Sequence, residues 1–113
     1  MTDDLKLAGK AVNLDVWFNH EAQSYGYGPP HNFVRWNPLL DDRDAFRLMA
    51  ALRFFVTYNQ TMNCVDVSGN VYFQPDFEER QPQFFGPGRS MNVYTATRIA
   101  IVKAAATLGR NKE

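Results

Sequence analysis

The residues best suited to binding chemistry gather near the start of a helix predicted over residues 92–108. Within its first turns lie Tyr94, Thr95, Thr97 and Arg98. Free backbone N–H groups and the positive end of the helix dipole favour a phosphate at such a position, and Arg98 adds a forked donor pair. The glycine-containing segment 86–90 before this helix supplies a second cation, Arg89. This pattern predicts a phosphate or nucleotide-ribose site. The alternative is helix capping, with Arg98 in a salt bridge or in solvent.

A second cluster of binding residues is Arg35-Trp36-Asn37, which precedes Pro38. An exposed Trp36 would stack on a nucleobase while Asn37 reads the edge of the base. The alternative is that Trp36 packs beneath the following helix and Asn37 forms an Asx-turn before the proline. Both interpretations remain open at this stage.

No catalytic or metal site is indicated. His20 and His31 lack the short spacing of a metal-binding pair, and Cys64 has no histidine nearby to activate a thiolate. Three acidic residues near position 42 are explained by capping and helix-dipole effects; they are Asp41, Asp42 and Asp44. Because no acid–base pair can be named, we expect a protein that is not an enzyme and that needs neither a cofactor nor a metal. An enzyme acting on nucleotides is the least favoured hypothesis.

Composition narrows the range of partners. The chain has 113 residues, with 12 basic and 12 acidic side chains and 14% aromatic residues. A net charge of zero provides no long-range attraction for nucleic acid or an anionic membrane. No apolar run reaches the ~20 residues needed to cross a bilayer, the acidic start does not resemble a secretory signal, and a single cysteine suits a reducing compartment. We therefore expect a cytoplasmic protein that binds neither nucleic acid nor membrane.

Hydrophobic periodicity and turn residues predict the elements that hold these clusters. We expect helices over 3–13, 42–53 and 92–108, with Gly109 ending the last one, and strands over 15–19, 54–58, 64–67 and 71–73. Segments 20–34 and 74–89 are predicted as irregular, and Ser68-Gly69-Asn70 as a tight hairpin. The Ala-rich face of the last helix suits close packing on a sheet.

This order predicts a single α+β domain over residues 1–113, in which a small antiparallel sheet packs with about three helices. A sheet of three or four strands leaves an unpaired edge. Joining two sheets across a two-fold axis would cover that edge, so we expect a homo-oligomer.

Two segments carry a resemblance to a known family. Trp36-Asn37-Pro38 followed by Asp44-Ala45-Phe46-Arg47-Leu48, together with the helix sequence from Tyr94 to Ala105, resembles small phage and prophage proteins of the phage ABA-sandwich type, related to the NinX-like proteins of lambdoid phages. The match covers residues 36–48 and 94–109, and residues 20–34 and 74–89 show no corresponding pattern.

The resemblance implies a phage protein acting in the cytoplasm of a host cell. Accessory phage genes of this size often counter host defence, and several encode oligomeric sponges that bind nucleotide-derived immune signals without cleaving them. By analogy, we expect a sponge for a small nucleotide-like ligand. The alternative is an accessory protein that binds a host protein and inhibits or modulates it.

Overall fold

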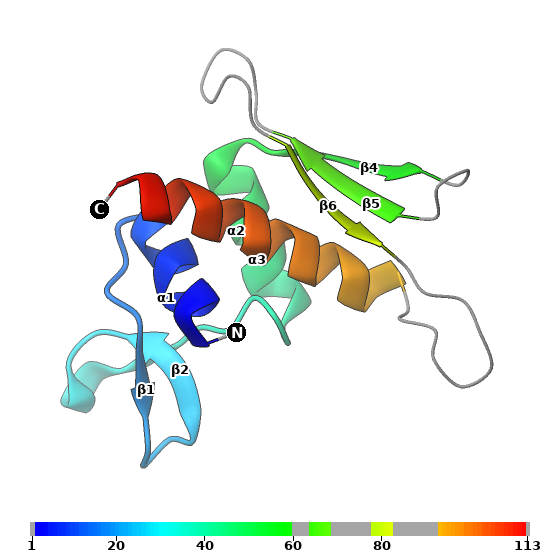
Figure 1. Cartoon of the computed structure of the whole chain (residues 1–113). Helices are drawn as coiled ribbons and strands as arrows, with labels where there is room; N and C mark the ends of the chain where they lie inside the picture. Colours follow the sequence, from blue (N-terminus) through cyan, green and yellow to red (C-terminus); the bar gives the residue numbers. More distant parts are fainter. Residues whose placement is uncertain (1, 60–63, 69–77, 83–92, 113) are drawn as a thin grey trace.

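The computed structural model describes residues 2–59, 64–68, 78–82 and 93–112. The elements are α1 (Thr2–Ala11), β1 (Trp17–Asn19), β2 (Ser24–Tyr27), the 3-10 turn η1 (Pro30–Asn32), β3 (Val34–Arg35), α2 (Asp42–Leu52), β4 (Phe55–Asn59), β5 (Cys64–Ser68), β6 (Glu78–Pro82) and α3 (Val93–Asn111). The predicted α+β class is confirmed, with two antiparallel three-stranded sheets in place of one. The sheets lie on opposite sides of the helices (Figure 1).

The first sheet, in the order β1-β2-β3, occupies much of the segment predicted to be irregular over 20–34. The expectation was wrong because glycine was taken as a strand breaker. Gly26 instead sits in the middle of β2, where the Phe33 ring and the Val34 backbone occupy the space that a Cβ would need. Phe33 also packs edge-on against Trp17, with ring centroids 5.1 Å apart. Aromatic cover of a strand glycine thus replaces the missing side chain.

The second sheet has the order β4-β5-β6. Ser68 pairs with Glu78 and Cys64 with Pro82, so β5 is paired with β6 on one side and with β4 on the other. The predicted tight hairpin at Ser68-Gly69-Asn70 lies outside the described residues, apart from Ser68 itself. β6 falls within the segment 74–89 that was predicted to be irregular. The expected strand 71–73 lies outside the described residues.

The last helix, α3, is the centre of the fold (Figure 1) and packs against α1, α2, β5 and β6. Its buried residues cover most of the helix circumference rather than one narrow stripe, and Lys103 and Arg110 are exposed on the remaining side. The buried residues are Ala96, Ala100, Ile101, Val102, Ala104, Ala105, Ala106 and Gly109. A helix that is apolar over so much of its surface belongs largely in the interior. The small alanine side chains allow neighbours to approach closely on several sides, and the sheet is only one of those neighbours.

The second helix, α2, has well-defined ends. The Asp41 carboxylate accepts hydrogen bonds from the backbone N–H groups of Arg43 and Asp44, at 2.8 and 3.2 Å, as an N-cap does. At the other end Arg53 adopts a left-handed conformation (φ 56°), and the Phe54 N–H donates to the Met49 carbonyl, which is the Schellman pattern. The helix buries Ala45, Leu48 and Leu52.

None of the described helices is both long and apolar enough to cross a membrane.

Candidate functional site

A groove lined by aromatic side chains lies between α2, β4 and the first half of α3. We call it the aromatic groove, and its volume is about 470 Å³. The groove is lined by Asp42, Ala45, Phe46, Met49, Phe54, Phe55, Val56, Tyr58, Tyr94, Thr97, Arg98 and Ile101. Four of its rings, those of Phe46, Phe55, Tyr58 and Tyr94, are between 54% and 69% exposed. Most of the large exposed hydrophobic side chains of the described chain are therefore gathered in one place.

The exposure of these four rings is unfavourable for the stability of the fold. Burying a large apolar side chain stabilises a protein by about 1.5–3 kcal/mol, so four rings left in water forgo a substantial gain. Phe46 follows the buried Ala45 on α2, and the other three rings come from β4 and from the first turn of α3. Contiguous exposed apolar surface of this kind marks a binding site more often than scattered single residues do.

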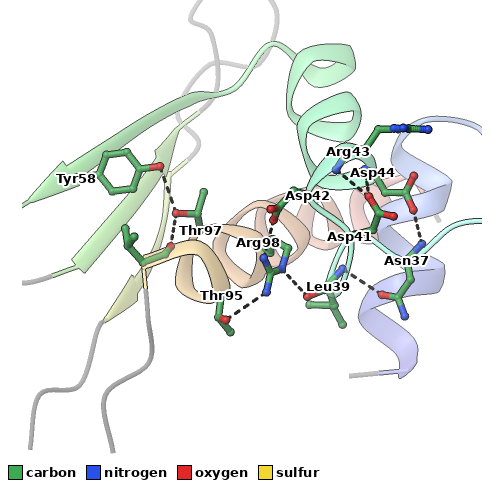
Figure 2. A network of polar contacts seen from close by, with 11 residues as sticks. Asn37, Leu39, Asp41, Asp42, Arg43, Asp44, Tyr58, Thr95, Thr97 and Arg98 are labelled. Atoms are coloured by element: carbon green, nitrogen blue, oxygen red, sulfur yellow. Dashed lines mark hydrogen bonds and ion pairs between the residues drawn. The ribbon is translucent and has the colours of Figure 1, made fainter.

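One end of the groove is polar and is organised by Arg98 (Figure 2). Its Nε donates to the Leu39 carbonyl at 2.9 Å, one terminal nitrogen pairs with Asp42 at 2.6 Å, and the other donates to the Thr95 hydroxyl at 3.2 Å. The Arg98 side chain is 18% exposed and that of Asp42 is 76% exposed. The guanidinium is thus fixed by α3 and by the turn before α2, and its charge is balanced by one carboxylate.

Two hydroxyl groups extend the polar end towards β4 (Figure 2). The Thr97 hydroxyl donates to the Val93 carbonyl at 2.6 Å and lies 3.3 Å from the Tyr58 hydroxyl. A threonine within a helix commonly bonds back to the carbonyl four residues earlier. Because Thr97 has a single proton, the Tyr58 O–H remains able to donate either to Thr97 or to a ligand.

The predicted site residues separate into two places. Tyr94, Thr97 and Arg98 line the aromatic groove together. Thr95 does not line the groove, but its hydroxyl accepts a hydrogen bond from Arg98. Arg89 lies outside the described residues. For Arg98, the salt-bridged alternative describes its contacts, so a phosphate would have to displace Asp42 to reach it.

The second predicted cluster lies elsewhere, between the first sheet and α2. Trp36 is only 7% exposed and belongs to the hydrophobic core, as the packing alternative requires, so its ring is not exposed for stacking on a base. Asn37 accepts the Leu39 N–H at 3.1 Å through its side chain, as the Asx-turn alternative requires, and its own N–H donates to Asp44 at 2.9 Å. Arg35 is exposed and lies at the end of β3.

The sequence did not point to three of the four exposed rings. Phe55 and Tyr58 lie in a segment with ordinary strand composition, and Phe46 stands beside the apolar stripe of α2, where a core role is the usual expectation. These rings meet only in the tertiary structure, where residues of α2, β4 and α3 line one groove. In the described part of the chain, no group of three His, Cys, Asp or Glu side chains is arranged to hold a metal ion.

No protein-family model, curated protein or solved structure matches the chain. The resemblance of residues 36–48 and 94–109 to NinX-like phage proteins therefore remains a prediction from sequence.

Proposed function

We propose that this chain is a non-enzymatic binding protein that holds a small, planar, nucleotide-like molecule in the aromatic groove and sequesters it. The observation that carries the proposal is the grouping of four exposed rings around one hollow with a polar end. Trp36 has no part in it, because its ring is in the core.

The size and lining of the groove support a small ligand. Ligand pockets commonly enclose about 300–1,000 Å³, are mainly apolar, and have a few polar groups that orient the ligand; the aromatic groove has a volume of about 470 Å³. Stacking a base on an aromatic side chain contributes about 1–3 kcal/mol. Two such contacts of about 2 kcal/mol each would tighten binding by nearly a thousandfold.

The polar end supports a ligand with hydrogen-bonding edges. The Asp42 carboxylate can accept hydrogen bonds from ring N–H groups, and the Arg98 guanidinium can donate hydrogen bonds to oxygens. Because Asp42 is largely exposed, its ion pair contributes only about 0–1 kcal/mol. An anionic group on the ligand can therefore replace Asp42 at low cost, while the Leu39 carbonyl still holds Arg98 in position.

The biological part of the proposal comes from the resemblance to phage proteins. A phage-derived oligomer in the host cytoplasm that binds an immune signal without cleaving it would need affinity and abundance, but no catalytic group. The aromatic groove is suited to that task because its chemistry is stacking and hydrogen bonding.

The test is native mass spectrometry of protein purified from a host extract, followed by denaturation and analysis of the released small molecules. We expect an intact nucleotide-like molecule to be released from the wild type and lost from the Phe46→Ala and Tyr94→Ala variants. Leu40→Ala is the matched control, because Leu40 is exposed but does not line this groove. Ligand-free wild-type protein that also fails to respond to a nucleotide panel in thermal-shift assays would overturn the proposal.

A second candidate function is the binding of a host protein. Four of the rings that line the aromatic groove are more than half exposed, whereas pockets for small molecules usually bury most of their ligand. Aromatic side chains are also enriched at protein interfaces. A single stoichiometric host protein retained by the wild type and lost from Phe46→Ala, with no small molecule released, would favour this function.

A further inference from the structure

A second groove lies on the other flank of α2 and has a different chemistry. We call it the arginine groove; its volume is about 440 Å³. Its wall includes Arg43 and Arg47 of α2, Arg35 of β3, and the ring of Tyr27 in β2. The aromatic groove uses Asp42, Phe46 and Met49 of the same helix, so α2 separates the two.

The arginines of this groove have few partners. Arg35 donates to the Ala22 carbonyl at 3.4 Å, which occupies one of the five N–H donors of a guanidinium. In the part of the chain that the structure describes, no carboxylate oxygen lies within 4.0 Å of a guanidinium nitrogen of Arg35, Arg43 or Arg47; the ion pair found there joins Arg98 to Asp42. Three guanidinium groups with unused donors therefore line one hollow.

The two carboxylates in the same groove both accept hydrogen bonds from backbone N–H groups. Asp41 accepts the N–H groups of Arg43 and Asp44 as the cap of α2. Asp44 accepts the N–H of Asn37 at 2.9 Å. With three arginines and two aspartates lining it, the groove has an excess of one positive charge, although the whole chain has none.

The spacing on the helix indicates what would occupy the groove. Arg43 and Arg47 are four residues apart, so they lie on the same face of α2, and like charges at that spacing destabilise a helix. An anion between them would convert this repulsion into attraction. Guanidinium groups match the oxygens of phosphate in bidentate geometry.

We propose that the arginine groove is a binding site for a phosphoryl group, held by Arg43 and Arg47 and completed by Arg35. The site is independent of the aromatic groove, since the two share no lining residue. Its ligand class is a small phosphorylated molecule, either an inorganic polyphosphate or the phosphate portion of a nucleotide.

The test is isothermal titration of the whole chain with sodium pyrophosphate in magnesium-free buffer. We expect saturable binding that weakens at least tenfold in Arg43→Gln/Arg47→Gln and also weakens in Arg35→Gln. The matched control is Lys6→Gln/Arg110→Gln, which removes the same charge from exposed positions outside the groove. It should bind pyrophosphate as the wild type does, and circular dichroism should show that every variant is folded.

Two results would overturn the proposal. One is the absence of saturable binding to the wild type at millimolar pyrophosphate; the other is an equal loss in the control, which would indicate a general charge effect. A full effect in Arg43→Gln/Arg47→Gln with none in Arg35→Gln would remove Arg35 from the site.

A parallel titration with ADP distinguishes the two sources of the phosphate. Equal affinities for ADP and pyrophosphate would assign the site to the phosphate alone. Tighter binding of ADP, reduced to the pyrophosphate level by Tyr27→Leu, would place the nucleoside in the same groove. Phe46→Ala should leave pyrophosphate binding unchanged, so a failure of the aromatic-groove function would be distinguishable from a failure of this one.

Discussion

Gly109 in α3 lies directly against the backbone of Leu7 in α1, so closely that a Cβ at position 109 would overlap the Leu7 carbonyl oxygen. Its position in the sequence suggested that Gly109 ends the helix. That prediction is wrong, because α3 continues to Asn111. Its role is to let two helices meet backbone to backbone. The contact joins the two ends of the described chain and fixes the position of α1 on the central helix.

Gly109→Ala should destabilise the protein by about 1–3 kcal/mol, because the added methyl group must push apart two packed backbones. The same substitution at an exposed helix site would stabilise by about 1 kcal/mol. Urea denaturation measures the change in the free energy of unfolding. Ala50→Gly, at an exposed position of α2, measures how much the difference in helix propensity between alanine and glycine contributes by itself. A more stable Gly109→Ala variant would show that the helices can separate freely.

Arg98→Gln should cost about 2 kcal/mol, since it removes the charged donor to the Leu39 carbonyl together with two further contacts. Asp42→Asn should cost less than about 1 kcal/mol, because it weakens only an exposed ion pair. Both are measured by chemical denaturation. Equal costs would mean that the ion pair, rather than the bond to Leu39, holds Arg98 in place.

Trp36→Ala should destabilise by about 3–5 kcal/mol, because it leaves a cavity where a large buried ring was packed. Trp36→Phe should cost less, since more of that volume stays filled. The free energy of unfolding of each variant gives the comparison. A Trp36→Ala variant with normal stability but without ligand would favour the stacking alternative for Trp36 over the packing one.

Asp41→Ala should lower the free energy of unfolding by about 1 kcal/mol through loss of the cap on α2. Asp41→Asn keeps an oxygen that accepts the same N–H groups and should remain close to the wild type. Thermal and urea unfolding of both variants test this. Similar losses in the two variants would assign the effect to charge rather than to capping.

Phe46→Ala should change stability by no more than about 0.5 kcal/mol, because the ring is largely exposed. If the aromatic groove binds a ligand, the same variant should lose most of its binding. Chemical denaturation measures the stability, and ligand release from the same preparation measures the binding, so the two effects of the substitution can be separated. A large loss of stability would instead identify Phe46 as a structural residue.

Local signals in the sequence were enough to locate the three helices. Asp41 and the spacing of Ala45, Leu48 and Leu52 place α2 within a residue of its observed bounds, because capping and periodicity act within a few residues of the chain. Strands β4 and β5 were found for a similar reason, from β-forming residues in short runs. The α+β class follows from these elements and their order.

Tertiary contacts decided the features that matter for binding. Three features depend on contacts that the local sequence does not reveal. They are the burial of Trp36, the place of Gly26 within a strand, and the position of Gly109 inside a helix, where it meets Leu7. The aromatic groove is also non-local, because its rings come from α2, β4 and α3. The amino-acid sequence by itself determined which segments become helices, since those signals are local. Only the packed structure decided which side chains remain exposed, since exposure depends on what the rest of the chain covers.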